Sequence, residues 1–229
     1  MILALSRKLY KSIKRTHEEL RFETDVSLRG FDLQKKTIGI IGGGSIGLHV
    51  ARMAKGFEMN VLVFDLNKNQ KIAKEIGFKY TTLKTLISKS DIITMHVPYN
   101  SHTHHLIDKD SISNMKQGVY LINTARGGII ETDSLYKGLK SGKIAGAALD
   151  VLENECNVLE ESSVLSEEFK KICDLKTILE DHKLMMMDNV IVTPHNAFNS
   201  IEALNRILDT TILNVKSYKN KKLINCVTK

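Results

Sequence analysis

Several features that define other classes of protein are missing from this 229-residue sequence. No apolar run reaches the roughly 20 residues that a membrane-spanning helix requires. The short apolar stretch at residues 1–5 precedes the first basic residues, which is the reverse of the order in a secretory signal peptide. We therefore expect neither secretion nor a membrane partner.

Cysteine is also scarce. The three cysteines are an odd number and form no C-x-x-C pair; they are Cys156, Cys173 and Cys226. This pattern does not support a disulfide framework, and it favours a reducing, cytoplasmic location. A short run holds three histidines, but no cysteine or carboxylate at ligand spacing accompanies them, so we predict no metal site at His102, His104 and His105.

Positive charge is present but dispersed. Lys and Arg number 33 against 26 Asp and Glu, which gives a formal net charge of +7 at pH 7. A surface that binds nucleic acid usually concentrates such charge in one patch. We therefore predict no nucleic-acid partner, with polyanion binding as the alternative.

Residues 5–20 have the spacing of one amphipathic helix. Their apolar stripe consists of Leu5, Leu9, Ile13 and Leu20, and most basic residues of the segment fall elsewhere. We expect this helix to pack on its own protein with the basic face in water. Binding to a membrane surface is the alternative.

From residue 37 the sequence alternates between short β-rich runs and helix-length segments. We expect strands at residues 37–41, 60–64, 92–97, 119–123, 145–151 and 190–193, and helices at 46–55, 67–76, 83–88, 133–141 and 201–218. This alternation is typical of a parallel sheet covered on both faces. The predicted fold is a doubly wound α/β domain, in which residues 153–189 form a surface excursion carrying one helix.

The first chemical motif is Gly42-Gly-Gly44-Ser-Ile-Gly47, between a predicted strand and a predicted helix. In a dinucleotide-binding fingerprint the first glycine allows a tight turn, the second lets the backbone approach a pyrophosphate, and the third permits close packing of the helix. The helix N-terminus offers amide groups and the positive end of its dipole to phosphates. We predict that this turn binds a dinucleotide.

A carboxylate ends the next predicted strand at Asp65. At that place it can accept hydrogen bonds from ribose hydroxyls and would repel a 2′-phosphate, which favours NAD over NADP. Two alternatives stay open: Asp65 caps the following helix, or the nearby Lys68 accommodates NADP.

Three later strand ends carry an arginine, carboxylates and a histidine. Arg126 follows the first of these strands, and His195 follows the last. The strand between them ends with three carboxylates, Asp150, Glu153 and Glu155. A guanidinium can hold a substrate carboxylate with two parallel hydrogen bonds. Taken alone, each of these residues more often has a structural role, such as an arginine in a salt bridge. Parallel strands, however, place all of them at the same edge of the sheet.

Together these motifs resemble the D-isomer-specific 2-hydroxyacid dehydrogenases, and are similar in particular to the D-lactate dehydrogenases, including the glycopeptide-resistance type. The only two prolines, Pro98 and Pro194, both fall on motif positions. The matching stretches are residues 36–44, 96–98, 105–107, 115–118, 123–127, 141–143, 148–151 and 193–195.

The resemblance implies a role for each residue. Arg126 would bind the substrate carboxylate and activate the keto group, and His195 would protonate the oxygen as NADH gives a hydride to the carbon. Glu155, rather than Glu153, would be the carboxylate partner of His195, and Phe198 would border the substrate. The residues expected around NAD are Gly42, Gly44, Ser45, Ile46, Gly47, Asp65, His96, Val97, Pro98, Thr124, Ala125, Arg126, Asp150 and His195.

Family members carry an N-terminal segment of roughly 100 residues, about one small domain, that this sequence lacks. The resemblance implies an interdomain helix remnant of the substrate domain at residues 1–25, a dinucleotide-binding domain at 26–197 and a C-terminal helix returning to the substrate domain at 198–229. It also implies a homodimer formed through the cofactor domain. A truncated NAD-binding and dimerisation module without turnover is the main alternative, and a corepressor-like homologue is another.

Overall fold

The computed structural model describes residues 1–153, 175–222 and 224–226. The chain divides into two compact units, Met1–Pro194 and His195–Lys229, and each is described by itself. The domain boundary predicted from the sequence lies nearby, between residues 197 and 198.

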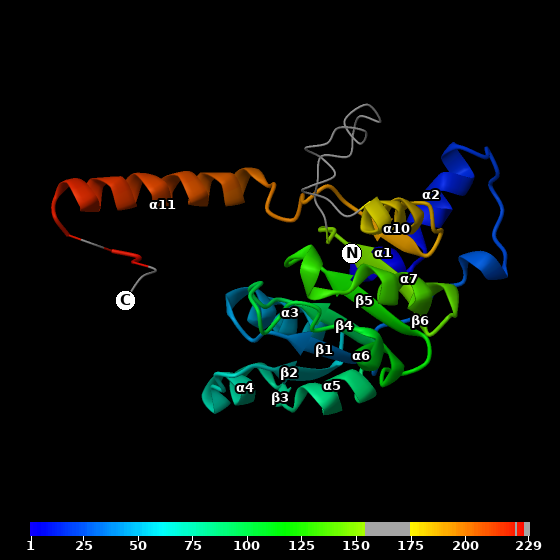
Figure 1. Ribbon diagram of the computed structural model, residues 1–229, viewed down its shortest axis with the longest axis horizontal. Helices are drawn as coiled ribbons and strands as arrows, with labels where there is room; N and C mark the ends of the chain where they lie inside the picture. Colours follow the sequence, from blue (N-terminus) through cyan, green and yellow to red (C-terminus); the bar gives the residue numbers. More distant parts are fainter. Residues whose placement is uncertain (154–174, 223, 227–229) are drawn as a thin grey trace. The chain divides into compact units, whose positions relative to one another are not determined.

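Within the described residues, the first unit is built on one seven-stranded parallel sheet (Figure 1). The strands are β1 (Thr37–Ile41), β2 (Asn60–Phe64), β3 (Lys79–Tyr80), β4 (Ile92–Met95), β5 (Val119–Asn123), β6 (Ile144–Leu149) and β7 (Val190–Val192). Their order is β3-β2-β1-β4-β5-β6-β7, so the direction of winding reverses between β1 and β4. Ligands of open α/β sheets bind at the carboxyl ends of the strands at such a reversal.

Helices cover both faces of the sheet. They are α1 (Ile2–Ser6), α2 (Leu9–His17), α3 (Ser45–Gly56), α4 (Gln70–Ile76), α5 (Leu83–Lys89), α6 (Lys109–Ser113), α7 (Thr132–Lys140) and α10 (Leu175–Met185). Successive strand side chains point to opposite faces, so the buried Ile40 joins a core with α1, α3 and α4, and the buried Ile41 joins another with α5, α6, α7 and α10. The prediction of a doubly wound α/β fold is confirmed.

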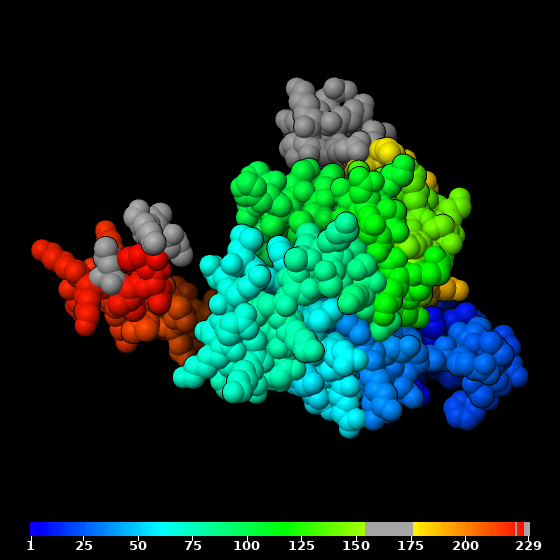
Figure 2. All heavy atoms as spheres, turned by 90° about the horizontal axis from the view of Figure 1, so that it is seen from below, coloured from blue at the N-terminus to red at the C-terminus, as the bar shows by residue number. Residues whose placement is uncertain are grey.

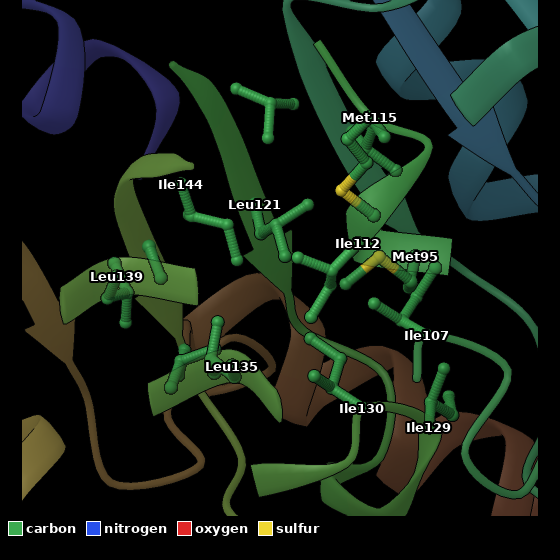
Figure 3. Close-up of a cluster of buried hydrophobic side chains, with 14 of the residues drawn as sticks. Met95, Ile107, Ile112, Met115, Leu121, Ile129, Ile130, Leu135, Leu139 and Ile144 are labelled. Carbon is green, nitrogen blue, oxygen red and sulfur yellow. The ribbon is translucent and has the colours of Figure 1, made fainter. Parts of the chain in front are cut away.

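The second of these cores is shown in Figure 3. Leu135 and Leu139 of α7 lie against Leu121 of β5 and Ile144 of β6, and all four are buried. In Figure 2 the side chains of α4 and α5 (cyan to teal) lie at the surface, between blue and green parts of the first unit. Because helices cover both faces of the sheet, the polar residues at the ends of its strands are the ones available to bind a ligand.

The prediction of a single helix over residues 5–20 is wrong. The helix ends at Ser6 and a second one begins at Leu9, because Lys8 adopts a left-handed conformation with φ 52°. A continuous helix would need the carbonyl of Ser6 to accept from the amide four residues later, but that carbonyl accepts a 2.9 Å hydrogen bond from the amide of Phe31. The break therefore arises from a contact distant in sequence.

Burial of the apolar stripe also differs from the expectation. Leu5 is buried in the sheet core, whereas Leu9 and Ile13 of α2 are each 49% exposed. Leu20 lies beyond the end of α2 and is 85% exposed. Only the α1 part of the predicted stripe packs into the core of its own unit.

The short elements β3 and α6 were not predicted, nor were the 3-10 helices η1 (Val26–Leu28) and η2 (Gly127–Ile129). β3 has only two residues, and α6 has five, with Asp108 as its N-cap accepting from the amide of Ser111 at 2.8 Å. Elements this short leave little periodicity in a sequence. The helix expected from residue 67 begins at Gln70, because Asn69 caps it by accepting from the amide of Ile72.

The second unit consists mainly of α11 (Ile201–Lys219). Ser200 caps this helix by accepting from the amide of Ala203 at 3.1 Å. Among the residues that the structure describes, no helix combines the length and the apolar character needed to cross a membrane.

Candidate active site

The glycine turn joins β1 to α3. Gly42 has φ +100°, and a Cβ atom there would lie 2.5 Å from the carbonyl oxygen of His96. A Cβ on Gly47 would lie 1.9 Å from the carbonyl oxygen of Gly42, so only glycine lets α3 approach this closely. Gly42 thus lets the turn pack against the segment that follows β4, and Gly47 lets α3 pack against the turn.

Gly44 has a different role, because a Cβ there would meet nothing within 4 Å. Gly44 is the N-cap of α3 and supplies no side-chain cap. The first amides of α3, those of the exposed Ser45 and Ile46, have no acceptor within the helix and are therefore available to an anion. The turn therefore fits the pyrophosphate of a dinucleotide.

Asp65 lies beside this turn. Its Oδ2 accepts from the amide of Gly43 at 2.6 Å, and its Oδ1 accepts from the amide of Asn67 at 2.7 Å. The alternative that Asp65 caps the following helix is wrong, because Asn69 is that cap. Each carboxylate oxygen can accept more than one hydrogen bond, so Asp65 keeps capacity for ribose hydroxyls.

The segment of His96, Val97 and Pro98 leaves β4 next to the same turn. The amide of His96 donates to the carbonyl of Ile41, just before the glycine turn, and the carbonyl of His96 packs against Gly42. The ring of His96 is hydrogen bonded to Thr94 at 2.9 Å and lines a cavity of about 310 Å³ between α3 and the chain start. Burial lowers the pKa of His96 to about 4, so the ring is neutral at pH 7.

Arg126 lies on a turn after β5 that Asn123 braces from inside. Asn123 is fully buried; its Nδ2 donates to the carbonyl of Arg126 at 2.9 Å, and its Oδ1 accepts from the amide of Ala125 at 3.0 Å. Arg126 itself is exposed, and its Nη1 donates to the carbonyl of Ala125 at 2.6 Å. No ion pair of Arg126 occurs among the described residues, so the salt-bridge alternative finds no partner there.

Two carboxylates follow β6. Asp150 is buried; its amide donates to the carbonyl of Asn123, and its side chain accepts from the hydroxyl of Thr193 after β7. Asp150 thus links the ends of three neighbouring strands. This places it at the same edge of the sheet as the Arg126 turn.

Glu153 is occupied by groups of its own unit. It contacts the Nε2 atom of His105 and accepts from the amide of Thr132 at 2.9 Å. Burial alone would raise the pKa of Glu153, but the hydrogen bonds from His105 and Thr132 outweigh it and hold that pKa below its usual value. Glu155, expected to pair with His195, lies outside the described residues.

His195 opens the second unit, three positions after the end of β7. It has a left-handed backbone with φ 50°, and its ring meets that of Phe198 edge-on, with 6.3 Å between the centroids. The structure thus brings together the glycine turn, Asp65 and the Arg126 turn in the first unit, and His195 with Phe198 in the second. The approach of His195 to Arg126 stays a prediction.

Two residues of this edge were not predicted from the sequence. Asn123 carried a local signal, a polar residue that ends an apolar strand three positions before an arginine. His105 carried no signal of its contact, because its partner Glu153 is 48 positions away. Within the described residues, no group of three His, Cys, Asp or Glu side chains is arranged to hold a metal ion.

Comparison with known proteins agrees with this geometry. The family model "D-isomer specific 2-hydroxyacid dehydrogenase, NAD binding domain" matches residues 1–197. A D-specific alpha-keto acid dehydrogenase of Enterococcus faecium is 38% identical over 221 residues, which cover 96% of this chain and 64% of the relative. An aromatic 2-oxoacid reductase of Clostridium sporogenes is 38% identical over 225 residues, which cover 96% of this chain and 63% of the relative.

Solved structures show the same similarity. The crystal structure of the D-lactate dehydrogenase from Aquifex aeolicus, complexed with NAD and lactic acid, matches with a TM-score of 0.84 and 39% identity. The match covers 96% of this chain and 64% of that structure. The chain therefore spans just under two thirds of the length of these relatives.

Proposed function

Because this chain belongs to the NAD-binding domain family of the D-isomer specific 2-hydroxyacid dehydrogenases, we propose that it serves an NAD-dependent oxidoreductase that reduces a small 2-oxo acid to a D-2-hydroxy acid. The observation that carries this proposal is the open space at Gly44, beside Asp65 and at the same sheet edge as the exposed guanidinium of Arg126. A dinucleotide and a carboxylate substrate are the ligands that suit these groups.

The cofactor site is assigned to the glycine turn and Asp65. The amides of Ser45 and Ile46 would hold the pyrophosphate, and the Asp65 carboxylate would accept from ribose hydroxyls. NADH supplies the hydride when bound. The negative charge of Asp65 disfavours the 2′-phosphate of NADPH, so NAD is the proposed cofactor.

The substrate site is assigned to Arg126 and to residues beyond β7. Arg126 would orient the substrate through its carboxylate and stabilise the negative charge that develops on the keto oxygen. His195 would donate a proton to that oxygen as a general acid, with Glu155 as its carboxylate partner and Phe198 beside the substrate. A D-lactate-type reaction, with pyruvate as substrate, is the specific form that we propose.

The proposal extends to the organisation of the chain. Residues 1–25 would belong with a substrate domain, residues 26–197 would form the cofactor domain, and residues 198–229 would return to the substrate domain. Two copies would form a homodimer through the cofactor domain. Since the chain spans just under two thirds of its relatives, an NAD-binding and dimerisation module without turnover is the second candidate function.

Titration with NADH, followed by assays of NADH oxidation with pyruvate and larger 2-oxo acids, tests the proposal. We expect NADH binding, turnover of at least one 2-oxo acid, and a loss of kcat of about 100-fold or more in His195→Gln with unchanged NADH affinity. NADH binding without turnover of any 2-oxo acid would favour the module. Failure to bind NADH would overturn both.

A further inference from the structure

Three chain segments leave the carboxyl ends of β4, β5 and β6, and Glu153 joins them. Glu153 lies on the segment after β6 and contacts His105 on the segment after β4. Its Oε2 accepts from the amide of Thr132, the first residue of α7, which follows β5. One half-buried carboxylate therefore connects all three segments.

The two glycines after Arg126 are enclosed by these segments. A Cβ on Gly127 would lie 1.8 Å from the carbonyl oxygen of Leu152, and a Cβ on Gly128 would lie 2.8 Å from the ring of Tyr99. The carbonyl of Gly128 also accepts from the amide of His105 at 2.8 Å. The backbone that immediately follows Arg126 thus depends on the spacing between the two segments that Glu153 and His105 connect.

His105 is itself held in an uncommon state. Its backbone is left-handed, with φ 49°, a conformation that non-glycine residues adopt only where their surroundings impose it. The ring of His104 stacks on the His105 ring with 3.8 Å between centroids, and the hydroxyl of Tyr99 is 3.0 Å from Nδ1 of His104. This arrangement presents Nε2 of His105 to Glu153.

We propose that Glu153 and His105 are positioning residues for Arg126, and that their contact sets the turn from which the guanidinium reaches the substrate carboxylate. The inference rests on the proposed function. An exposed, flexible guanidinium is placed chiefly by its backbone, and a displacement of about 1 Å at a reacting group costs on the order of 100-fold in rate. Glu153 is thereby given a role distinct from that proposed for Glu155.

The test compares four variants. Glu153→Ala removes both contacts. Glu153→Gln removes the charge but keeps an oxygen that can accept from Thr132 and an NH2 group that can donate to Nε2 of a neutral His105. His105→Gln removes the ring but leaves the contact with Thr132. The matched control is Asp133→Ala, on the first turn of α7, whose carboxylate forms ion pairs with Lys137 and Lys176. Wild type and variants are titrated with NADH and then, saturated with NADH, with oxamate, a 2-oxo acid analogue that is not reduced.

We expect Glu153→Ala and His105→Gln to weaken oxamate binding by about tenfold or more, with NADH affinity within about twofold of wild type. Glu153→Gln should recover most of the loss, and Asp133→Ala should match wild type. If Glu153→Ala and His105→Gln bind oxamate as tightly as wild type, the inference is wrong. Should Glu153→Ala fail to fold, His105→Gln carries the comparison.

A ligand-free readout separates this inference from the proposed function. The Nε–Hε nuclear magnetic resonance signal of Arg126, assigned with Arg126→Lys, should shift in Glu153→Ala and His105→Gln but not in Asp133→Ala. Wild-type protein that binds NADH but not oxamate would overturn the proposed substrate role, while a shifted signal would still support positioning. An unshifted signal in both variants would overturn the inference even if oxamate binds to wild type.

Discussion

The side chain of Asn123 donates a 2.9 Å hydrogen bond to the carbonyl of Arg126 from a position with no exposure to water. The same side chain accepts from the amide of Ala125, so it holds both backbone groups of the turn. Any other conformation of the turn would leave one of these buried groups without a hydrogen bond, which carries a desolvation cost. The exposed guanidinium of Arg126 therefore extends from backbone that a buried side chain holds in place.

Replacement of Asn123 should be costly. In Asn123→Ala the carbonyl of Arg126 and the amide of Ala125 both lose their partner, so we expect a loss of about 2–4 kcal/mol in the free energy of unfolding. Urea denaturation measures this loss. The control is Asn114→Ala, which removes an exposed amide bonded to the carbonyl of Asp110 at 2.8 Å. Equal losses in the two variants would contradict the bracing role.

The glycine turn should separate stability from cofactor affinity. A Cβ at Gly47 would collide with backbone, so Gly47→Ala should lower both stability and NADH affinity. A Cβ at Gly44 has room in the protein, so Gly44→Ala should leave stability unchanged. It should lower NADH affinity by about tenfold or more, because the methyl group enters the space for the pyrophosphate. Thermal unfolding and NADH fluorescence titration distinguish the two.

Gly56→Ala is the control for both variants, since it lies in the last turn of α3 with open space around a Cβ. It should leave NADH affinity unchanged and leave stability equal or raised by up to about 1 kcal/mol. Normal NADH binding by Gly44→Ala would place the pyrophosphate elsewhere.

His96 should make stability depend on pH. Its pKa is lowered by burial to about 4 in the folded protein, against 6.5 as its ordinary value, so the unfolded chain binds the proton more readily. Stability should therefore fall as the pH drops from about 6.5 towards 4, with a loss of about 2 kcal/mol between pH 7 and pH 5.

Urea denaturation at pH 7 and pH 5 measures this effect in wild type and in His96→Gln. The variant should lose most of the pH dependence, and His49→Gln, at an exposed position on α3, should keep it. A pH dependence in His96→Gln equal to that of wild type would exclude His96 as its source.

The parts of the fold that sequence could predict are those that local chemistry determines. The run from Thr37 to the glycine turn combines a β-rich strand, a tight turn and a helix start within about 20 residues, so the residue pattern that identifies it is local. The break at Lys8 depends instead on Phe31 taking the carbonyl of Ser6. The contact of His105 with Glu153 likewise requires three strands to be in place.

Asp65 should determine the choice between NADH and NADPH. Asp65→Asn keeps an oxygen for the amide of Gly43 but removes the charge that repels a 2′-phosphate and accepts strongly from ribose hydroxyls. We expect NADH to bind about tenfold more weakly and the ratio of NADPH to NADH affinity to rise by at least about tenfold.

Paired fluorescence titrations with NADH and NADPH measure the ratio. The control is Asp32→Asn, which removes an exposed carboxylate 3.9 Å from Arg7 and away from the turn. Both variants lose one negative charge, so a long-range increase in the attraction between the protein and the 2′-phosphate of NADPH would appear in both. That effect would grow as the ionic strength falls. An equal rise in the two variants would show that Asp65 does not contact the ribose, whereas a rise confined to Asp65→Asn would place the carboxylate at the 2′ position.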